Sequence, residues 1–218
     1  ITSAGVASAI NVISALKKSS KFEPYIHASD MSENAAGLYL ADNYSLTPPA
    51  SDKNYLRKIF EIVDKNKIDF IFPIHSSEIE LFSSNLRLFR EKKIGLFVPK
   101  LKSVNLCNSK DKFFKFMESH CIPIPKVYKY EECKDNFPVF IKPITGSSSS
   151  GAKKISDLAE LEYITKNNKE NFIIQEFLDW KEITVDCYVS KSKNLIGCVP
   201  RFRVKVKDGK SIVSQTFT

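Results

Sequence analysis

The sequence predicts an α/β protein in which a doubly wound parallel sheet is followed by an α+β domain. Apolar runs of strand length alternate with amphipathic helical segments through residue 98, which is typical of a parallel sheet covered by helices. From residue 138 onward the chain reads as strands with one helix near residues 157–167. The 218 residues, 43% of them hydrophobic, suffice for two modest cores.

The first domain opens with a strand end at residues 2–5 that turns into a helix. Val6, Ile10 and Ile13 recur at helical spacing, so one face of this helix is apolar. A short strand near residues 25–27 follows. This is a βα entry that lacks most of its first strand.

Two further helix and strand pairs complete the first domain. An amphipathic helix over 52–66 leads into an apolar run over 68–74, which predicts a buried parallel strand. Ser76 and Ser77 are N-cap candidates for one further helix, which ends before a strand over 94–98. In such a sheet the ligand crevice lies at the carboxyl ends of the strands. The core-facing stripe expected on the third helix is Ile79, Phe82, Leu86 and Phe89.

The pattern changes after Pro99. A helix over 109–120 is followed by two prolines, which end it and lead into an extended segment over 127–130. The residues of this helix expected to face inward are Phe113, Phe116 and Met117.

We therefore expect two domains, over residues 1–99 and 100–218. Within the second, residues 100–175 form an N-terminal lobe with a phosphate-covering flap, and residues 176–218 begin a truncated C-terminal lobe. The chain starts without a methionine and ends within an apolar-alternating run, so we expect it to be a piece of a longer protein.

The stretch over 138–143 is an apolar strand that ends in Lys142, and a loop of small residues over 146–151 follows it. A buried strand rarely ends in a cation without a partner for it. Small loop residues let backbone N–H groups approach a phosphate chain, whose charge Lys142 would balance. This combination indicates a nucleotide triphosphate site. The alternative is that Lys142 extends to solvent and that the serine-rich stretch is a flexible surface loop.

Two other nucleotide motifs are excluded. Gly146 and Gly151 have the spacing of a P-loop, but Ala152, Lys153 and Lys154 follow where that motif needs lysine and then serine or threonine. A dinucleotide-binding fingerprint is absent, because the first helix is preceded by a single glycine.

Composition narrows the function classes. The net charge of +8 fits an anionic ligand, but the basic residues are scattered and often lie beside acids. No nucleic-acid module is recognisable, so a basic nucleic-acid-binding protein is a weaker alternative; it predicts binding that falls steeply with salt and ignores Lys142→Ala. The five cysteines form no C-x-x-C pair and the three histidines are dispersed, which favours a reduced, cytoplasmic protein without a zinc site. No stretch approaches transmembrane length.

Polar and apolar residues alternate along 182–189, which places Glu182 and Asp186 on one face of a strand. Arg201 and Arg203 share a face of a strand over 200–206, and a guanidinium suits a transferring phosphate or a carboxylate substrate. The alternative for both arginines is a solvated edge strand whose charges oppose aggregation.

Taken in order, these segments resemble the ATP-grasp superfamily, most closely proteins similar to the large chain of carbamoyl-phosphate synthase. Residues 1–99 resemble the Rossmann-like pre-ATP-grasp domain of that family, on Ala41-Asp42 with Pro48 or Pro49 and on Phe72-Pro73-Ile74 with Glu78 and Glu80. The segments that carry the resemblance in the second domain are Asp111-Lys112, 139–143 with the loop 146–151, 174–178, and Trp180-Lys181-Glu182 with Asp186.

The resemblance implies roles for single residues. Lys112 and Lys142 would hold the nucleotide phosphates together. Glu176 would accept a hydrogen bond from the adenine amino group and Glu182 would accept one from a ribose hydroxyl; taken singly, each reads as an ordinary exposed acid. Asp186 would orient Lys142 or a polar neighbour. The remaining nucleotide-binding candidates are Gly146, Ser147, Ser148, Ser149 and Gly151 of the flap, and Phe177 and Leu178 of the adenine-binding linker.

The reaction implied by the resemblance is ATP-dependent activation of a carboxylate as an acyl phosphate, followed by attack of an amine or ammonia. Arg201 and Arg203 are its catalytic candidates. The cofactors are ATP and Mg²⁺, and the metal ligands are expected beyond Thr218, so the fragment is expected to bind nucleotide weakly without turnover. The expected partners are small-molecule carboxylate and amine substrates, with no nucleic acid, no membrane and a homodimer as a possible assembly. The alternative is a non-catalytic nucleotide-binding or regulatory module.

Overall fold

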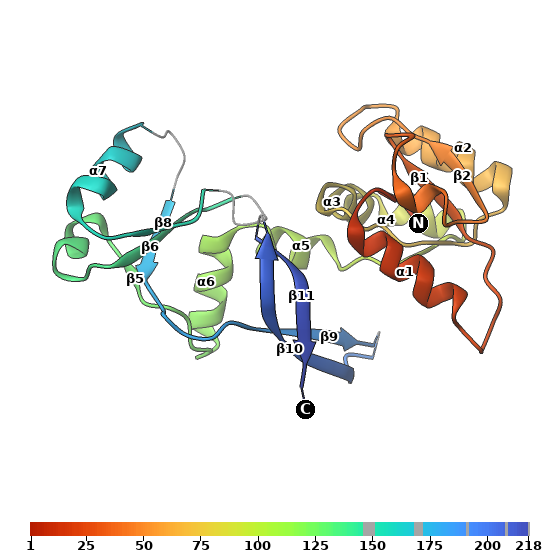
Figure 1. The fold of residues 1–218 in the computed structure, drawn as a ribbon. Helices are drawn as coiled ribbons and strands as arrows, with labels where there is room; N and C mark the ends of the chain where they lie inside the picture. Colours follow the sequence, from red (N-terminus) through yellow and green to blue (C-terminus); the bar gives the residue numbers. More distant parts are fainter. Residues whose placement is uncertain (146–150, 168–171, 191, 208, 218) are drawn as a thin grey trace. The chain divides into compact units, whose positions relative to one another are not determined.

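The computed structural model describes residues 1–145, 151–167, 172–190, 192–207 and 209–217 (Figure 1). The chain divides into two compact units, Ile1–Asn105 and Leu106–Thr218. Each unit combines helices with strands, the first around parallel strands and the second around antiparallel strands. The predicted fold class, a parallel α/β domain followed by an α+β domain, is therefore confirmed.

The strands of the first unit form one parallel arrangement. β1 pairs with β2 and β3 pairs with β4, and residues 1–4 lie between the two pairs. This central segment is bonded on both sides, because Thr2 N donates to Phe72 O and Ala4 N donates to Ser29 O, each at 3.1 Å. The elements of this unit are α1 (Ala7–Lys17), β1 (His27–Asp30), η1 (Ala36–Leu38), β2 (Asn43–Leu46), α2 (Tyr55–Asn66), β3 (Phe70–Ile71), α3 (Ser76–Ser84), α4 (Leu86–Glu91), β4 (Gly95–Leu96) and α5 (Leu101–Cys107), which runs past the division.

Two clusters form the core of the first unit. The larger joins α2, α3 and α4 to β3, and its aromatic centre is Phe82 and Phe89, whose ring centroids lie 5.3 Å apart. The smaller is made of small side chains, Ala4, Ala28, Ala35 and Leu38. Gly37 belongs to this tight packing, because a Cβ at that position would lie 2.3 Å from the carbonyl oxygen of Ala4.

Several sequence predictions for the first unit need correction. The strand predicted near 25–27 is β1, which starts at His27, because small residues that pack against other small residues carry little hydrophobic signal. The single helix predicted after Pro73 is α3 followed by α4. The helix is interrupted at Asn85, whose side-chain amide donates to Leu81 O at 2.8 Å. Its N-cap is His75 rather than Ser76 or Ser77.

The second unit contains two antiparallel sheets. The first has the strand order β5-β8-β6-β7, and the second has the order β11-β10-β9. Its elements are α6 (Lys110–Ser119), β5 (Val127–Tyr128), η2 (Tyr130–Asp135), β6 (Val139–Pro143), β7 (Lys153–Ile155), α7 (Leu158–Asn167), β8 (Phe172–Glu176), β9 (Ile183–Val189), β10 (Leu195–Lys207) and β11 (Lys210–Thr216).

One face of the first of these sheets is covered by α7. Val139, Ile141, Ile155 and Ile174 pack with Leu161 of α7 in a buried core, and Figure 1 shows this helix beside β6 and β8. The prediction that Phe116 faces inward is wrong, since its side chain is 39% exposed and its ring contacts His120, with centroids 4.2 Å apart.

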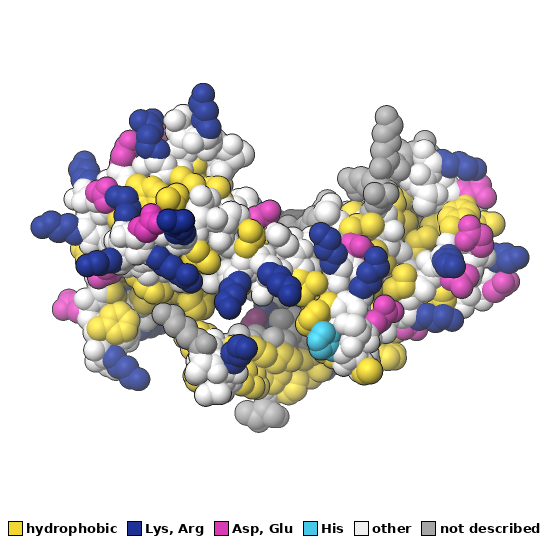
Figure 2. All heavy atoms as spheres, turned by 180° about the vertical axis from the view of Figure 1, so that it is seen from behind, with side chains coloured by type: hydrophobic (Ala, Val, Ile, Leu, Met, Phe, Trp, Pro, Cys, Tyr) yellow, Lys and Arg dark blue, Asp and Glu magenta, His cyan; other side chains and the backbone are white. Residues whose placement is uncertain are grey.

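The surface carries scattered charge. Figure 2 shows Lys and Arg side chains spread over the face in view, with apolar and neutral areas between them. Within the part of the chain that the structure describes, no helix is both long and apolar enough to cross a membrane.

Candidate functional site

The register of β6 decides which side chains share the second face of its sheet. Phe140 is opposite Gln175 of β8 and Lys154 of β7, and Lys142 is opposite Ile173. Side chains alternate along a strand, so these residues lie on the face away from the buried core of Val139 and Ile141. Two basic groups, an aromatic ring and an amide therefore lie on one sheet face.

Lys142 is half-buried and its ammonium group lies 4.6 Å from the centroid of the Phe114 ring of α6. Burial and, to a smaller extent, the nearby positive charge of Lys110 lower the pKa of Lys142 below its ordinary value. No carboxylate forms an ion pair with Lys142 among the described residues. A desolvated cation beside another cation is an arrangement that an anionic ligand stabilises.

The position of α6 explains this geometry. Lys110 N, at the start of the helix, donates to Ile144 O just beyond β6 at 3.1 Å. Lys110 and Phe114 are four residues apart, so they share the helix face directed at Lys142. The helix start is thereby fixed to the end of the strand that carries Lys142.

The structure does not bring Lys112 into contact with Lys142. Lys112 is exposed, and at two residues from Lys110 it lies about 200° further around the helix. Among the described residues, the lysine of α6 whose charge acts on Lys142 is Lys110. The role of Lys112 stays a prediction.

An aromatic surface lies beside the two basic strand residues. The rings of Phe140 and Phe177 have centroids 6.5 Å apart, and the Lys154 ammonium group lies 4.3 Å from the centroid of Phe177. Phe177 and Leu178, the predicted linker, are both half-buried after the end of β8. A flat aromatic base can pack against such rings.

Gln175 adds a polar group to the same face. Its side chain is 7% exposed, and within the described parts of the chain its Oε1 atom has no hydrogen-bond partner. A buried carbonyl oxygen without a donor is costly unless a ligand or water supplies one.

Glu176 is bound to the neighbouring strand segment. Its Oε1 accepts a hydrogen bond from Lys126 N at 2.8 Å, and its own N–H donates to Lys126 O at 2.9 Å. The carboxylate therefore continues the pairing of β5 and β8 by one further bond. Its predicted role towards adenine stays a prediction.

The predicted flap is described only at its end. Gly146, Ser147, Ser148 and Ser149 lie outside the described residues. Gly151 has a φ of 71°, and a Cβ there would lie 2.9 Å from Cγ of Pro143. A glycine is therefore favoured where the chain returns towards β7.

The remaining candidates meet on one face of the sheet of β9, β10 and β11. The Arg203 guanidinium pairs with Glu182 at 2.5 Å and donates to Gly209 O at 2.6 Å. Arg201 donates from Nε to Asp186 at 2.7 Å, and this bond raises the pKa of Arg201. Asp186 thus orients Arg201 and has no contact with Lys142 in the described structure. The predicted ribose acceptor and the two predicted catalytic arginines lie together, each arginine held by an acid.

Sequence reasoning missed Lys110, Phe114, Lys154 and Gln175. Two signals in the sequence could have found Gln175 and the neighbouring Phe140. The alternation that exposes Lys142 also exposes Phe140 on the same face, and the apolar run over 172–178 contains one amide among its buried positions. The place of Lys110 depends on how α6 meets β6, which no local pattern encodes.

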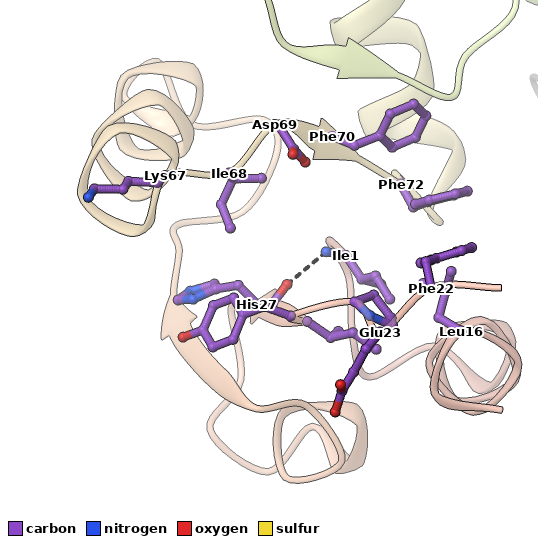
Figure 3. A pocket seen from close by; sticks show the side chains of 13 residues that line it. Ile1, Leu16, Phe22, Glu23, His27, Lys67, Ile68, Asp69, Phe70 and Phe72 are labelled. Carbon is purple, nitrogen blue, oxygen red and sulfur yellow. Dashed lines mark hydrogen bonds between the residues drawn. The ribbon is translucent and has the colours of Figure 1, made fainter. Parts of the chain in front are cut away.

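A separate hollow of about 540 Å³ lies in the first unit (Figure 3). Its lining is largely aromatic and aliphatic, and the dashed line in Figure 3 is the bond from the Ile1 amino group to His27 O, 2.8 Å long. Its lining contains one lysine, Lys67, whereas the face that carries Lys142 has several.

Comparisons with known proteins match both units. The model of the PylC-like, N-terminal domain matches residues 1–97, and the model of an ATP-grasp domain matches residues 107–214. No curated protein matches this chain.

Solved structures share the fold at low identity. The biotin carboxylase domain of a 2-oxoglutarate carboxylase from Hydrogenobacter thermophilus has a TM-score of 0.72 and 19% identity, over 94% of this chain and 50% of that one. An L-amino acid ligase from Bacillus licheniformis has a TM-score of 0.61 and 11% identity, over 84% and 45%. N5-carboxyaminoimidazole ribonucleotide synthetase from Thermus thermophilus has a TM-score of 0.58 and 13% identity, over 80% and 47%.

The chain thus spans about half the length of these solved structures. The two family matches follow each other in the order that the sequence predicts, and together they leave out only short segments. The chain belongs to the ATP-grasp superfamily, among the members whose ATP-grasp domain follows a pre-ATP-grasp domain.

Proposed function

We propose that this chain is the nucleotide-binding part of an ATP-dependent ligase that activates a carboxylate as an acyl phosphate for attack by an amine or ammonia. The observation that carries the proposal is Lys142. Its half-buried ammonium group lies beside a second cation, Lys110, and has no carboxylate partner in the described structure. A polyphosphate is the ligand that this arrangement fits best.

The structural neighbours support the choice of ligand. The Hydrogenobacter thermophilus domain is described in complex with MgADP, ADP and bicarbonate. The Bacillus licheniformis protein is named as an L-amino acid ligase. Because the chain spans about half of each, the activity and substrates of the whole protein are proposals.

In the proposed reaction a carboxylate oxygen attacks the γ-phosphorus of ATP and ADP leaves. The amine nitrogen then attacks the acyl carbon, and phosphate leaves as the new C–N bond forms. The cations of Lys142 and Lys110 would balance charge on the phosphates, and Arg201 or Arg203 would balance charge on the transferring group. No protein nucleophile is required.

The magnesium ion implied by the family would supply positive charge that balances the charge of the phosphates. Among the residues that the structure describes, no group of three His, Cys, Asp or Glu side chains could hold a metal ion.

The nucleotide base would lie on the aromatic surface of Phe140 and Phe177. The buried Oε1 of Gln175 on the same face can accept a hydrogen bond from the amino group of adenine, which guanine lacks at that ring position. Glu176 is opposite Val139, on the other face of the sheet, so Gln175 is the acceptor that lies on the aromatic face.

The experiment that tests this function is nucleotide binding by the full chain, measured as the thermal shift caused by ATP. We expect Lys142→Ala to remove most of the shift, and Lys166→Ala, which removes an exposed lysine paired with Glu162, to keep it. A loss of affinity of about tenfold corresponds to about 1.4 kcal/mol. An equal ATP shift in both variants would contradict the proposal.

A non-catalytic nucleotide-binding module is the second candidate. The ion pair between Glu182 and Arg203 favours this second candidate. In that pair each charge neutralises the other, so neither is left unpaired for a reacting substrate. The two functions differ in turnover. When the whole protein is supplied with ATP and a mixture of carboxylates, hydroxylamine would trap the acyl phosphate of a ligase as a hydroxamate and ADP would be released, whereas a binding module would release no ADP.

Domain limits, assembly and location are also proposals. We keep the domains at 1–99 and 100–218, which the division after Asn105 and the family matches support to within a few residues. A homodimer is supported by the description of the Hydrogenobacter thermophilus domain as a dimer. A cytoplasmic location fits five free cysteines.

A further inference from the structure

A cavity of about 460 Å³ lies at the carboxyl ends of the parallel strands of the first unit. Several strand segments contribute to its lining at or beyond their carboxyl ends: Ser3 and Gly5 from the central segment, Asp30 at the end of β1, Thr47 directly after β2, and His75 in the segment that follows β3. The cavity is therefore built by several strand ends rather than by one loop.

The strand order places this cavity at a topological switch point. The segment over 1–4 is central, the next two strands, β1 and β2, lie on one side of it, and β3 and β4 lie on the other. Connections leave the central strand in opposite directions, which opens a crevice at its carboxyl end where open α/β sheets bind ligands.

Glu78 forms a charged part of the lining. Its side chain is buried, with 4% exposed, and its Oε2 accepts a hydrogen bond from Oγ1 of Thr2 at 2.7 Å. Its Oε1 accepts one from the hydroxyl of Tyr55. Burial and the Glu78 carboxylate raise the pKa of Tyr55 far above its ordinary value, so the phenol stays a donor. The Glu78 carboxylate is held in one orientation.

Asp30 forms a second charged part. Its Oδ2 accepts from Gly5 N at 2.8 Å and its Oδ1 accepts from Ser32 N at 2.9 Å, so this carboxylate is also fixed. Asp30 and Glu78 are the acids of the lining, and within the described lining there is no lysine or arginine. A concave site with fixed carboxylates and no lysine or arginine in its described lining attracts a cation.

The rest of the lining is suited to a short apolar body. Val6, Met31, Pro48, Pro49 and Ala50 contribute aliphatic surface, and Ser51 and Ser77 contribute hydroxyl groups. The volume is large enough for a molecule of amino-acid size. The chemistry thus differs from that of the Lys142 site, where the protein supplies the cations.

We propose that this cavity binds a small molecule that carries a primary ammonium group on a short aliphatic body. The identification of this small molecule as the amine reactant of the ligase rests on the proposed function. The binding of an ammonium compound in this cavity does not depend on that function. Asp30 and Glu78 would face the ammonium group, and the aliphatic residues would contact the body.

The test uses L-leucinamide as the probe and N-acetyl-L-leucinamide as its uncharged control, titrated into the isotope-labelled full chain and followed by NMR. We expect saturable shifts at the amides of Gly5 and Ser77 and at the methyl group of Met31 with leucinamide, and binding weaker by about tenfold or more with the acetylated form. Asp30→Asn should weaken leucinamide binding by about tenfold. Asp64→Asn, which removes an exposed acid paired with Lys92, should leave it unchanged.

Ser51→Trp is the second variant. It fills the cavity without removing a charge or a hydrogen bond of Asp30, so it should abolish the leucinamide shifts. Equal affinity for both probes, unchanged binding in Asp30→Asn or Ser51→Trp, or no saturable shift would each overturn the inference. ATP titrated into the same samples separates it from the proposed function. Leucinamide shifts that persist in a chain that fails to bind ATP would support this site and count against the ligase.

Discussion

The ammonium group of Lys142 contacts an aromatic ring of α6 and lies near a second lysine, and both features act on its charge. The ring of Phe114 stabilises the cation, whereas burial and Lys110 favour its neutral form. A bound phosphate would offset the effects of burial and of Lys110, because its negative charge favours the charged form of both lysines. This geometry therefore fits a site arranged for an anion.

This balance predicts a pH dependence. The pKa of Lys142 is lowered, so the charged form is lost as pH rises through a value below the 10.5 of an ordinary lysine, and ATP affinity should fall there. Removing the like charge in Lys110→Ala raises the pKa of Lys142, so the fall in affinity should move to higher pH. The measurement is ATP affinity against pH by calorimetry for the two proteins. A fall at the same pH in both would show that Lys110 does not act on Lys142.

Gln175 supplies a second test at the residue scale. Gln175→Met keeps the length of the side chain and removes the buried acceptor that has no partner in the described structure, so stability should be unchanged or slightly raised. ATP affinity should fall by about tenfold if Oε1 accepts from the adenine amino group. Urea unfolding measures the first effect and calorimetry the second. A variant that loses stability but keeps ATP affinity would assign Gln175 a structural role.

At the scale of elements, strand alternation made part of the site predictable. The run over 139–143 places Lys142 and Phe140 on one face once it is recognised as a strand, and 182–189 places Glu182 with Asp186. Both arginines of β10 then meet these acids across the sheet. The contact between α6 and β6 could not be predicted, because it depends on where the helix start meets the strand end.

Helix boundaries were less predictable for the same reason. The continuous stripe of Ile79, Phe82, Leu86 and Phe89 fits one helix, yet Asn85 bonds to Leu81 O and divides it. A side chain that competes for a backbone carbonyl is a local effect that apolar periodicity does not report. The alanine-rich packing around β1 could not be predicted from the sequence, because small side chains bury little apolar area and give a weak hydrophobic pattern.

This packing gives a prediction for η1. Gly37→Ala would place a Cβ 2.3 Å from a backbone oxygen that cannot easily move, so we expect a loss of about 1–3 kcal/mol in the free energy of unfolding. Gly197→Ala is the matched control, because a Cβ there meets nothing within 4 Å. Chemical denaturation of both variants makes the comparison. Equal stability would show that the segment over 36–38 can shift away from Ala4.

At the scale of the whole molecule, the sequence predicted the fold class, a parallel α/β part followed by an α+β part, since the alternation of strands and helices gives way to strands after residue 138. The net charge of +8 did not predict a site: the charge is spread over the surface seen in Figure 2, and most Lys and Arg residues that form ion pairs are exposed. What distinguishes Lys142 is burial and a cationic neighbour, which only the folded chain reveals.

The central claim is that Lys142 contacts the phosphates of a bound nucleotide, and calorimetric titration of ATP and of adenosine into the full chain and Lys142→Ala tests it most directly. We predict that the substitution weakens ATP binding by about tenfold or more and leaves adenosine binding nearly unchanged, because adenosine has no phosphate for the ammonium group to contact. Equal weakening of both ligands, or of neither, would contradict the claim.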